Sequence, residues 1–210
     1  MLFRSIFRYL IQFLTASTLV LIGKPPVSPL EFILITLIMT AIINFTNFMD
    51  GIDGLVAGCG VVLMASSSAW ALSGAIFGFL LWNWSPAKVF MGDVGSTFIG
   101  AVIGGLALQE TSYAEVLSRI LIGFPLFGDA LFCLLRRCFA GENIFIPHRK
   151  HLFQRLHQGG WSHGKVSAMY ILGVVLLLLS RVVGGINLML IAILAQIALA
   201  YFLDKKVAKV

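Results

Sequence analysis

This chain has 210 residues, of which 59% are hydrophobic and only 11% are charged, and its mean hydropathy is +0.97. Ordinary soluble domains carry about 25% charged residues. The composition therefore excludes a water-soluble fold and predicts an integral membrane protein. Much of the net charge of +6 lies in one segment, residues 136–165.

Five stretches approach the ~20 apolar residues that a helix needs to cross a bilayer core. They are residues 6–22, 30–48, 116–135, 166–183 and 184–203. The first has a basic start, but no small-residue cleavage site follows it, so we expect a retained helix and not a signal peptide. The sequence predicts an all-α, polytopic transmembrane helical bundle that forms one domain over residues 1–210.

Residues 55–84 are harder to assign, because this length gives only about 45 Å of helix, less than two full crossings require. An even number of crossings, however, places segment 136–165 and the carboxyl-terminal lysines on the same, cytoplasmic side as the amino terminus. The positive-inside rule favours that arrangement. We therefore expect a shortened or re-entrant hairpin, broken near residues 66–68 or Gly74, whose backbone groups need protein neighbours as partners.

The first polar block is N-F-T-N-F-M-D-G-I-D-G-L, residues 44–55, at the end of an apolar helix. Asn44 and Asn47 share a helix face, and Asp50 and Asp53 each precede a glycine that lets the backbone turn tightly beside a ligand. Ionisable groups at such a depth are costly and usually functional. A pair of capped D-G turns is the structural alternative, but the doubled motif favours a binding loop.

The second block is N-W-S-P-A-K-V-F-M-G-D-V-G-S-T, residues 83–97. Pro86 is expected to start a helical turn and Ser96 to cap the next helix. Asp93, helped by an oxygen from the first block, suits Mg²⁺, which prefers carboxylates and other oxygen ligands; a plain capped turn is the alternative. Lys88 is expected either to touch a phosphate or to extend toward lipid headgroups.

The third block is H-R-K-H-L-F-Q-R-L, residues 148–156, continuing to G-G-W-S-H. Arginine offers a planar fork to phosphate oxygens, and histidine exchanges protons near neutral pH. The alternative for this basic loop is an orientation signal that attracts anionic lipid. Two histidines without a third ligand form only a weak zinc pattern. The three cysteines show no metal-ligand spacing and are expected to be packing residues: Cys59, Cys133 and Cys138.

The three blocks, in this order and each followed by an apolar segment, resemble the polyprenyl-phosphate N-acetylhexosamine-1-phosphate transferases of glycosyltransferase family 4 over residues 4–166. The resemblance implies a multi-pass enzyme of the bacterial inner membrane with cytoplasmic active-site loops. Such an enzyme uses Mg²⁺ to move a sugar 1-phosphate from a UDP-N-acetylhexosamine to undecaprenyl phosphate, releasing UMP. The products serve cell-wall, lipopolysaccharide or O-antigen synthesis, and the H-R-K-H form is more similar to the hexosamine branch than to the muramyl-pentapeptide branch.

The resemblance also implies roles for individual residues. Asp93 would be the principal metal ligand, Asn47 would lie at the metal and the diphosphate, and Asp53 would contact the uracil. Catalysis would rest on Asp93 together with Asp50 and His148. The other expected substrate contacts are Asn44, Lys88, Arg149 and His151, with His148 shared between both roles.

Members of this family normally carry an aspartate pair on an earlier cytoplasmic loop, but this sequence contains no Asp-Asp and begins just after the expected place. We therefore expect a member without the family's amino-terminal helices. One hypothesis is a transferase that retains its donor and metal site. The other is a catalytically silent membrane subunit that works with a partner chain, and a transporter is a weaker third. Expected partners are the UDP-sugar, the lipid phosphate, membrane lipid and a second copy or partner chain, but no nucleic acid.

Overall fold

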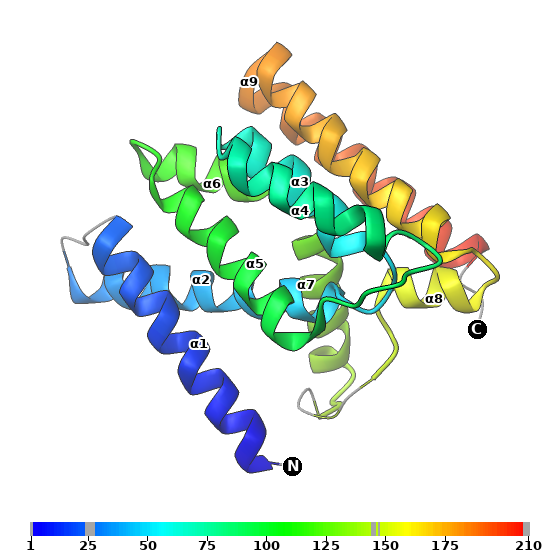
Figure 1. Ribbon diagram of the computed structural model, residues 1–210, viewed down its shortest axis with the longest axis horizontal. Helices are drawn as coiled ribbons and strands as arrows, with labels where there is room; N and C mark the ends of the chain where they lie inside the picture. Colours follow the sequence, from blue (N-terminus) through cyan, green and yellow to red (C-terminus); the bar gives the residue numbers. More distant parts are fainter. Residues whose placement is uncertain (1, 24–27, 144–145, 147, 208–210) are drawn as a thin grey trace.

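The computed structural model describes residues 2–23, 28–143, 146 and 148–207. Over this part of the chain it contains nine helices and no strand, which confirms the predicted all-α class (Figure 1). In chain order the helices are α1 (Leu2–Gly23), α2 (Pro29–Met49), α3 (Leu55–Ser66), α4 (Trp70–Asn83), α5 (Gly92–Leu108), α6 (Tyr113–Ile122), α7 (Phe124–Phe139), α8 (Leu152–Gln158) and α9 (His163–Lys206).

Helix α2 carries the first polar block at its carboxyl end and packs against α1, α5 and α7. It starts sharply, because the Ser28 side chain accepts the N–H of Glu31 at 3.2 Å and Pro29 occupies the first turn. Helix α5 approaches α2 closely at Gly100, where an added Cβ would lie 2.8 Å from the Cα of Ile43. A small residue at this crossing allows the two backbones to approach closely. This close approach brings the carboxyl end of α2 and the start of α5 together.

Helices α3 and α4 form the predicted short hairpin. Ser68, in the turn between them, has a positive φ of 58°, and the Ser73 hydroxyl donates to the carbonyl of Val61 at 2.9 Å across the hairpin. The break therefore falls near residues 66–68, as predicted, and the alternative position, Gly74, lies inside α4. The hairpin thus begins, at Leu55, and ends, at Asn83, at the same end of the bundle.

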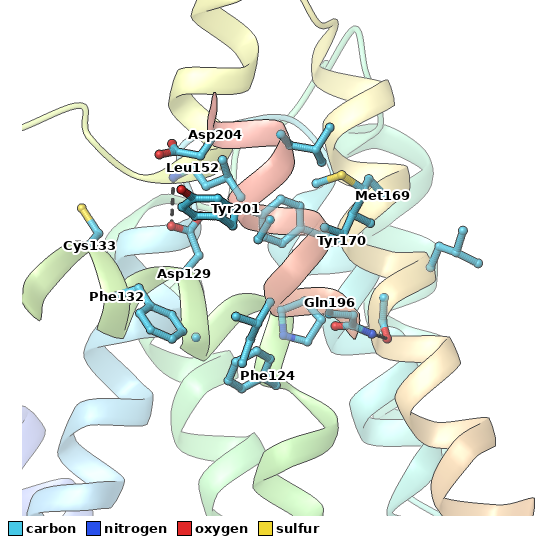
Figure 2. Close-up of a pocket in the computed structure, with 18 of the residues that line it drawn as sticks. Phe124, Asp129, Phe132, Cys133, Leu152, Met169, Tyr170, Gln196, Tyr201 and Asp204 are labelled. Atoms are coloured by element: carbon cyan, nitrogen blue, oxygen red, sulfur yellow. Dashed lines mark hydrogen bonds between the residues drawn. The ribbon is translucent and has the colours of Figure 1, made fainter. Parts of the chain in front are cut away.

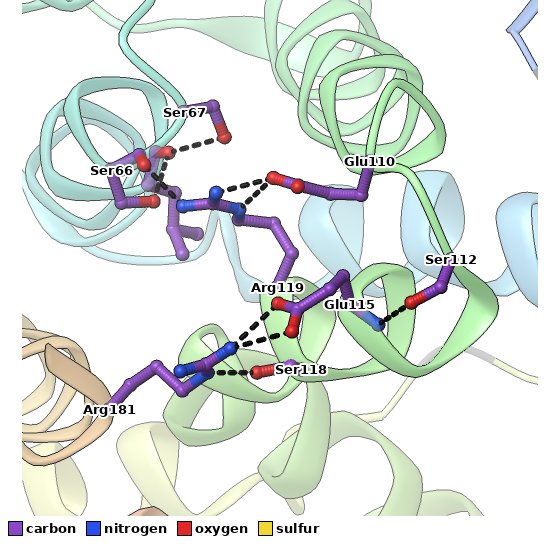
Figure 3. A network of polar contacts seen from close by, with 9 residues as sticks. Ser66, Ser67, Glu110, Ser112, Glu115, Ser118, Arg119 and Arg181 are labelled. Carbon is purple, nitrogen blue, oxygen red and sulfur yellow. Dashed lines mark hydrogen bonds and ion pairs between the residues drawn. The ribbon is translucent and has the colours of Figure 1, made fainter. Parts of the chain in front are cut away.

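Arg119 supplies a protein neighbour of the kind that the hairpin was expected to need, and Arg181 links α9 to α6 (Figure 3). Arg119 of α6 donates to the carbonyl of Ser66 at the end of α3, and its Nε donates to Glu110 at 2.7 Å. Arg181 of α9 holds both carboxylate oxygens of Glu115, at 2.7 and 2.9 Å. These contacts satisfy a helix-end carbonyl and join α3, α6 and α9 at the end opposite to the polar blocks.

Residues 116–135, one of the stretches predicted to approach the length of a span, do not form one continuous helix. Helices α6 and α7 meet at an angle of 86° around Gly123. Pro125, near the start of α7, has no N–H with which to continue the hydrogen-bond ladder of α6. The pair is therefore one broken span or a re-entrant element, and a membrane crossing by this stretch stays a prediction.

Helix α9 folds back on itself at Gly185, which has φ 64° and ψ −158°. The amide of Gln196 donates to the carbonyl of Gly173 at 2.9 Å. In a straight helix, residues this far apart in sequence would be separated by about 35 Å. The two arms are thus antiparallel, and they correspond to the predicted segments 166–183 and 184–203.

The apolar helices are those of a membrane protein. Of the described helices, α2 and α9 are long and apolar enough to cross a membrane, and the bent pair α6–α7 would be a third. Helices α3, α4 and α5 are apolar but shorter, as is the Phe7–Gly23 part of α1. Of the five predicted segments, 30–48 lies in α2, 116–135 lies in the bent pair, and 166–183 and 184–203 lie in the two arms of α9.

Candidate functional site

The first and second polar blocks meet where α2 ends and α5 begins. The Nδ2 of Asn47 donates to Asp93 Oδ1 at 3.2 Å and to the Ser96 hydroxyl at 2.9 Å. Ser96 does not cap α5 as predicted, because the helix already starts at Gly92 and Ser96 lies inside its first turn, donating to the Gly92 carbonyl. Asp93 therefore stands in the first turn of α5, with 74% of its side chain exposed.

Helix α1 adds a cation to this pair that the sequence analysis did not assign to the site. The Nη1 of Arg8 lies 3.2 Å from Asp93 Oδ2. One turn further along α1, Gln12 is buried and neither of its amide atoms has a partner among the described residues. An arginine and a glutamine spaced four apart in an apolar helix share one face, and this spacing is the signal that identifies them.

Asp50 and Asn44 complete the end of α2. Burial, and then the negative charge of Asp93, raise the pKa of Asp50 to about 6. Asn44 is buried one and a half turns earlier, where its Nδ2 donates to the carbonyl of Thr40 while its Oδ1 has no described partner. Two carboxylates that repel one another, close to amide groups, form an oxygen-rich place suited to a hard divalent cation.

Asp53 lies in the same loop but has other partners. Its Oδ2 accepts the N–H of Ala87 at 3.2 Å and lies 3.2 Å from Nδ1 of His163 at the start of α9. Its carbonyl accepts the hydroxyl of Ser167 at 2.6 Å. Asp53 therefore ties the first block to the second block and to α9.

The second block is an ordered loop rather than the helical turn expected at Pro86. Residues 84–91 are not helical. The buried side chain of Asn83 accepts the N–H of Gly54 at 3.1 Å and donates to the carbonyl of Val89 at 2.9 Å. These side-chain bonds replace the local helical ones, so the prediction of a turn started by Pro86 is wrong.

Two predicted phosphate contacts, Lys88 and Arg149, are exposed side chains. The ammonium of Lys88 lies 5.3 Å from the ring centroid of Trp82, in a cation–π contact. Both expectations for Lys88, a phosphate contact and extension toward lipid headgroups, stay predictions. Arg149 lies in the loop part of the third block, and its side chain is exposed.

The third block packs against the first through aromatic side chains. His151 forms the N-cap of α8 and is 5% exposed. Its ring stacks on His148, with centroids 5.0 Å apart, and on Phe153 at 5.7 Å. Phe48, beside Asn47 on α2, lies 6.3 Å from the His151 ring. The structure thus brings all three predicted blocks to one end of the bundle.

The two histidines have opposite protonation tendencies. Burial, and then the charge of His151, lower the pKa of His148 to about 4. Burial also opposes a charge on His151, but the facing Asp129 carboxylate and the Cys133 sulfur outweigh it and raise the pKa of His151 to about 9. At neutral pH, therefore, His148 is a proton acceptor and His151 carries a proton.

Asp129 on α7 is a further residue that the sequence analysis missed. Its side chain is 6% exposed. It accepts the N–H groups of Leu152 and Phe153 at 2.9 and 3.2 Å and the hydroxyl of Tyr170 at 2.6 Å. It therefore caps α8 and holds the third block in place. In the sequence, Asp129 could have been recognised as an isolated carboxylate inside an apolar stretch.

A cavity of about 410 Å³ lies between α7, the start of α8 and the two arms of α9 (Figure 2). Its wall is mostly apolar, and Phe124, Phe132 and Met169 belong to it. Arg136 and Lys150 line it as well, beside the third block. Two carboxylates, Asp129 and Asp204, line the same hollow, so its polar groups carry both signs of charge.

Comparison with known proteins decides the family. Residues 2–111, more than half of the chain, match the family model described as Glycosyl transferase family 4. The chain belongs to glycosyl transferase family 4. The matched part of this family 4 chain includes the first two polar blocks, whereas the third block is joined to them by the contacts of His151.

Curated relatives include N-acetylglucosaminyl 1-phosphate transferases and phospho-N-acetylmuramoyl-pentapeptide-transferases. A probable undecaprenyl-phosphate N-acetylglucosaminyl 1-phosphate transferase of Bacillus subtilis is 35% identical over 155 residues, which cover 64% of this chain and 43% of that protein. A decaprenyl-phosphate N-acetylglucosaminephosphotransferase of Mycobacterium tuberculosis is 31% identical over 172 residues, covering 64% and 43%. An undecaprenyl-phosphate alpha-N-acetylglucosaminyl 1-phosphate transferase of Thermotoga maritima is 33% identical over 109 residues, covering 52% and 37%.

The relationship is thus distant and partial, and the chain spans about two fifths of the length of these curated relatives. It nevertheless places this family 4 member among relatives of the polyprenyl-phosphate N-acetylhexosamine-1-phosphate transferases. The contacts between Asn47 and Asp93 lie wholly within the matched residues.

Proposed function

We propose that this family 4 chain transfers N-acetylhexosamine 1-phosphate from a UDP-sugar to undecaprenyl phosphate in the bacterial inner membrane. The observation that carries the proposal is the contact between Asn47 and Asp93, which joins two motif blocks from distant parts of the sequence beside Asp50. The names of the relatives support both substrates. In this reading, the end of the bundle that holds the polar blocks faces the cytoplasm.

Magnesium is the proposed cofactor, and the residues present suit it. Asp93 offers an exposed carboxylate, and the Asn47 amide beside it presents Oδ1 instead of Nδ2 after a half-turn of its side chain. The raised pKa of Asp50, caused by burial and by Asp93, marks a repulsion that a cation would relieve. When bound, Mg²⁺ would neutralise charge on the donor diphosphate.

The transfer moves one phosphoryl group. An oxygen of the lipid phosphate attacks the sugar-bearing phosphorus, the bond to UMP breaks, and UMP leaves with the electron pair. Two anions must meet, so cationic side chains at the phosphates are needed. Arg8, already beside Asp93, and Arg149 would bind phosphate oxygens. Asp50, with a pKa of about 6, is suited to take a proton from the acceptor phosphate.

The third block and the loop of Asp53 would hold the donor. His148 is largely neutral at pH 7, with a pKa of about 4 caused by burial and His151, so it accepts hydrogen bonds from the sugar. Asp53 is held by Ala87 and His163, and this fixed carboxylate would accept the N–H of uracil. Asn44, whose Oδ1 has no described partner, would meet the same donor.

The cavity between α7 and α9 suits the acceptor lipid. Its apolar wall would receive part of the isoprenoid chain, and Arg136 and Lys150 would face the phosphate. Both side chains are 48% exposed, so they are accessible to a charged headgroup. The nearby carboxylate of Asp204 is already paired with Arg155 and Arg136 and so adds little repulsion.

The test is transfer of labelled sugar phosphate by the purified full chain in detergent. UDP-N-acetylglucosamine, undecaprenyl phosphate and Mg²⁺ are supplied, and label in the lipid phase is compared with released UMP. We expect equal amounts of both, and neither without the lipid or with a chelator. Folded protein that does not bind the UDP-sugar would refute the proposal, whereas binding with turnover only beside a partner chain would identify a silent subunit.

Replacement of Arg8 by glutamine is expected to tighten divalent-metal binding at Asp93. Arg8 is the counter-ion of that carboxylate, and the two side chains are 35% and 74% exposed. Exposed ion pairs contribute about 0.2–1 kcal/mol, so the gain should be about 1.5- to 5-fold. Titration of Mn²⁺ followed by electron paramagnetic resonance measures it. Unchanged or weaker Mn²⁺ binding in the folded variant would show that Arg8 and the metal do not compete.

A further inference from the structure

A second cluster of metal-binding side chains lies apart from Asp93. Cys133 on α7, His148 in the loop and His151 at the start of α8 each offer one ligand atom, and these atoms lie within 4.8 Å of one another. Cys133 is 4% exposed and His151 is 5% exposed. We propose that these three residues form a binding site for Zn²⁺ or a similar borderline metal ion.

The ligand chemistry separates this site from the magnesium site. A thiolate and two imidazoles select zinc, whereas carboxylate and amide oxygens select magnesium. Zinc–ligand bonds of about 2.0–2.3 Å place tetrahedral ligand atoms about 3.3–3.6 Å apart. The three side chains therefore need to close by about 1 Å, a side-chain adjustment. His148 is half-buried, so a fourth ligand can reach the site from solvent.

The surroundings of His151 resemble those of a metal ligand. Its Nδ1 is buried and has no hydrogen-bond partner among the described residues, and it lies 3.8 Å from Asp129 Oδ1. Asp129 is held by two backbone N–H groups and by the hydroxyl of Tyr170. A fixed carboxylate behind a histidine orients the ring and strengthens its bond to a metal.

The charges around the cluster also permit a cation. Three basic side chains are near, but each has an acidic partner. Arg137 and Lys150 both pair with Glu142, and Arg136 pairs with Asp204 at 3.7 Å. Glu142 and Asp204 thus offset part of this positive charge, and the Asp129 carboxylate that faces His151 is the group that favours a cation.

Zinc at this site would occupy both histidines of the third block. Bound metal would therefore exclude the donor sugar, so the site would act as an inhibitory control. This consequence rests on the proposed function, whereas metal binding itself does not. The test therefore measures binding directly and uses no turnover.

Cobalt titration of the full chain tests the proposal. The chelator-treated protein in detergent, with excess Mg²⁺ to fill the oxygen site, is titrated with Co²⁺, which reports a thiolate ligand by a charge-transfer band in the near ultraviolet. We expect the band to saturate at one equivalent and to disappear when Zn²⁺ is added. Cys133→Ser should abolish it and weaken Zn²⁺ binding by more than about 100-fold, beyond the loss caused by an outer-shell change.

The matched control is Cys138→Ser, on the same helix and exposed, which should keep the band. His148→Ala, in the loop, should remove it even if Cys133→Ser fails to fold. Folded wild-type protein without the band, or a band that persists in either Cys133→Ser or His148→Ala, would overturn the assignment. Because the readout is a spectrum, its failure leaves the sugar-phosphate transfer untouched.

Discussion

Asp93→Asn is expected to reduce sugar-phosphate transfer by about 10³-fold, the size of effect seen when one electrostatic contact to a transition state is removed. The substitution keeps the shape of the side chain but removes the charge that would bind Mg²⁺. The fold should survive, because the Asp93 side chain is 74% exposed and its described side-chain partners are Asn47 and Arg8. Initial rates of lipid-linked sugar formation at saturating Mg²⁺ measure the effect.

A neighbouring substitution provides the control for Asp93→Asn. Val94→Ala changes a residue in the same turn of α5 that is 85% exposed, and it should leave transfer unchanged. Asp93→Glu keeps the charge but moves it, so partial activity with a raised Mg²⁺ requirement is expected. Full activity of Asp93→Asn in a Mg²⁺-dependent assay would place the metal elsewhere.

The proximity of Asn47 and Asp93 could be predicted from the sequence. In so apolar a chain, polar side chains are stable only where helices end or where other polar groups surround them. Each of the two lies at the end of an apolar stretch, and such ends gather at the surface of the bilayer. The hairpin of α3 and α4 followed from counting residues against bilayer thickness and from the basic residues. In both cases, the limited thickness and the apolar interior of the membrane made the local sequence sufficient for the prediction.

Contacts between helices that are far apart in the sequence could not be predicted from the sequence. In the sequence, Arg8 is only part of the basic start of the first apolar stretch, and its pairing with Asp93 depends on how α1 crosses α5. Cys133 was expected to pack only, because its spacing from His148 and His151 fits no metal pattern, yet the bend between α6 and α7 carries it to them. Cys138, expected to pack as well, is exposed.

Asp129→Ala is expected to destabilise the protein by about 3–5 kcal/mol, the usual cost of removing one partner from a buried charged network. The carboxylate is 6% exposed and accepts hydrogen bonds from Leu152, Phe153 and Tyr170. Without it, the first N–H groups of α8 lose their cap and His151 loses its facing charge. Thermal unfolding in detergent, followed by circular dichroism, measures the loss of stability.

Asp129→Asn separates the two contributions of this carboxylate, shape and charge. An amide oxygen in the Oδ2 position can still accept two of the three bonds, those from Phe153 and Tyr170, so we expect a smaller loss of about 1–3 kcal/mol. If the third block is part of the site, transfer should fall in Asp129→Asn below the unfolding temperature as well, because His151 is no longer oriented. A variant that unfolds earlier but transfers normally when folded would make Asp129 a purely structural cap, and the third block would then function without it.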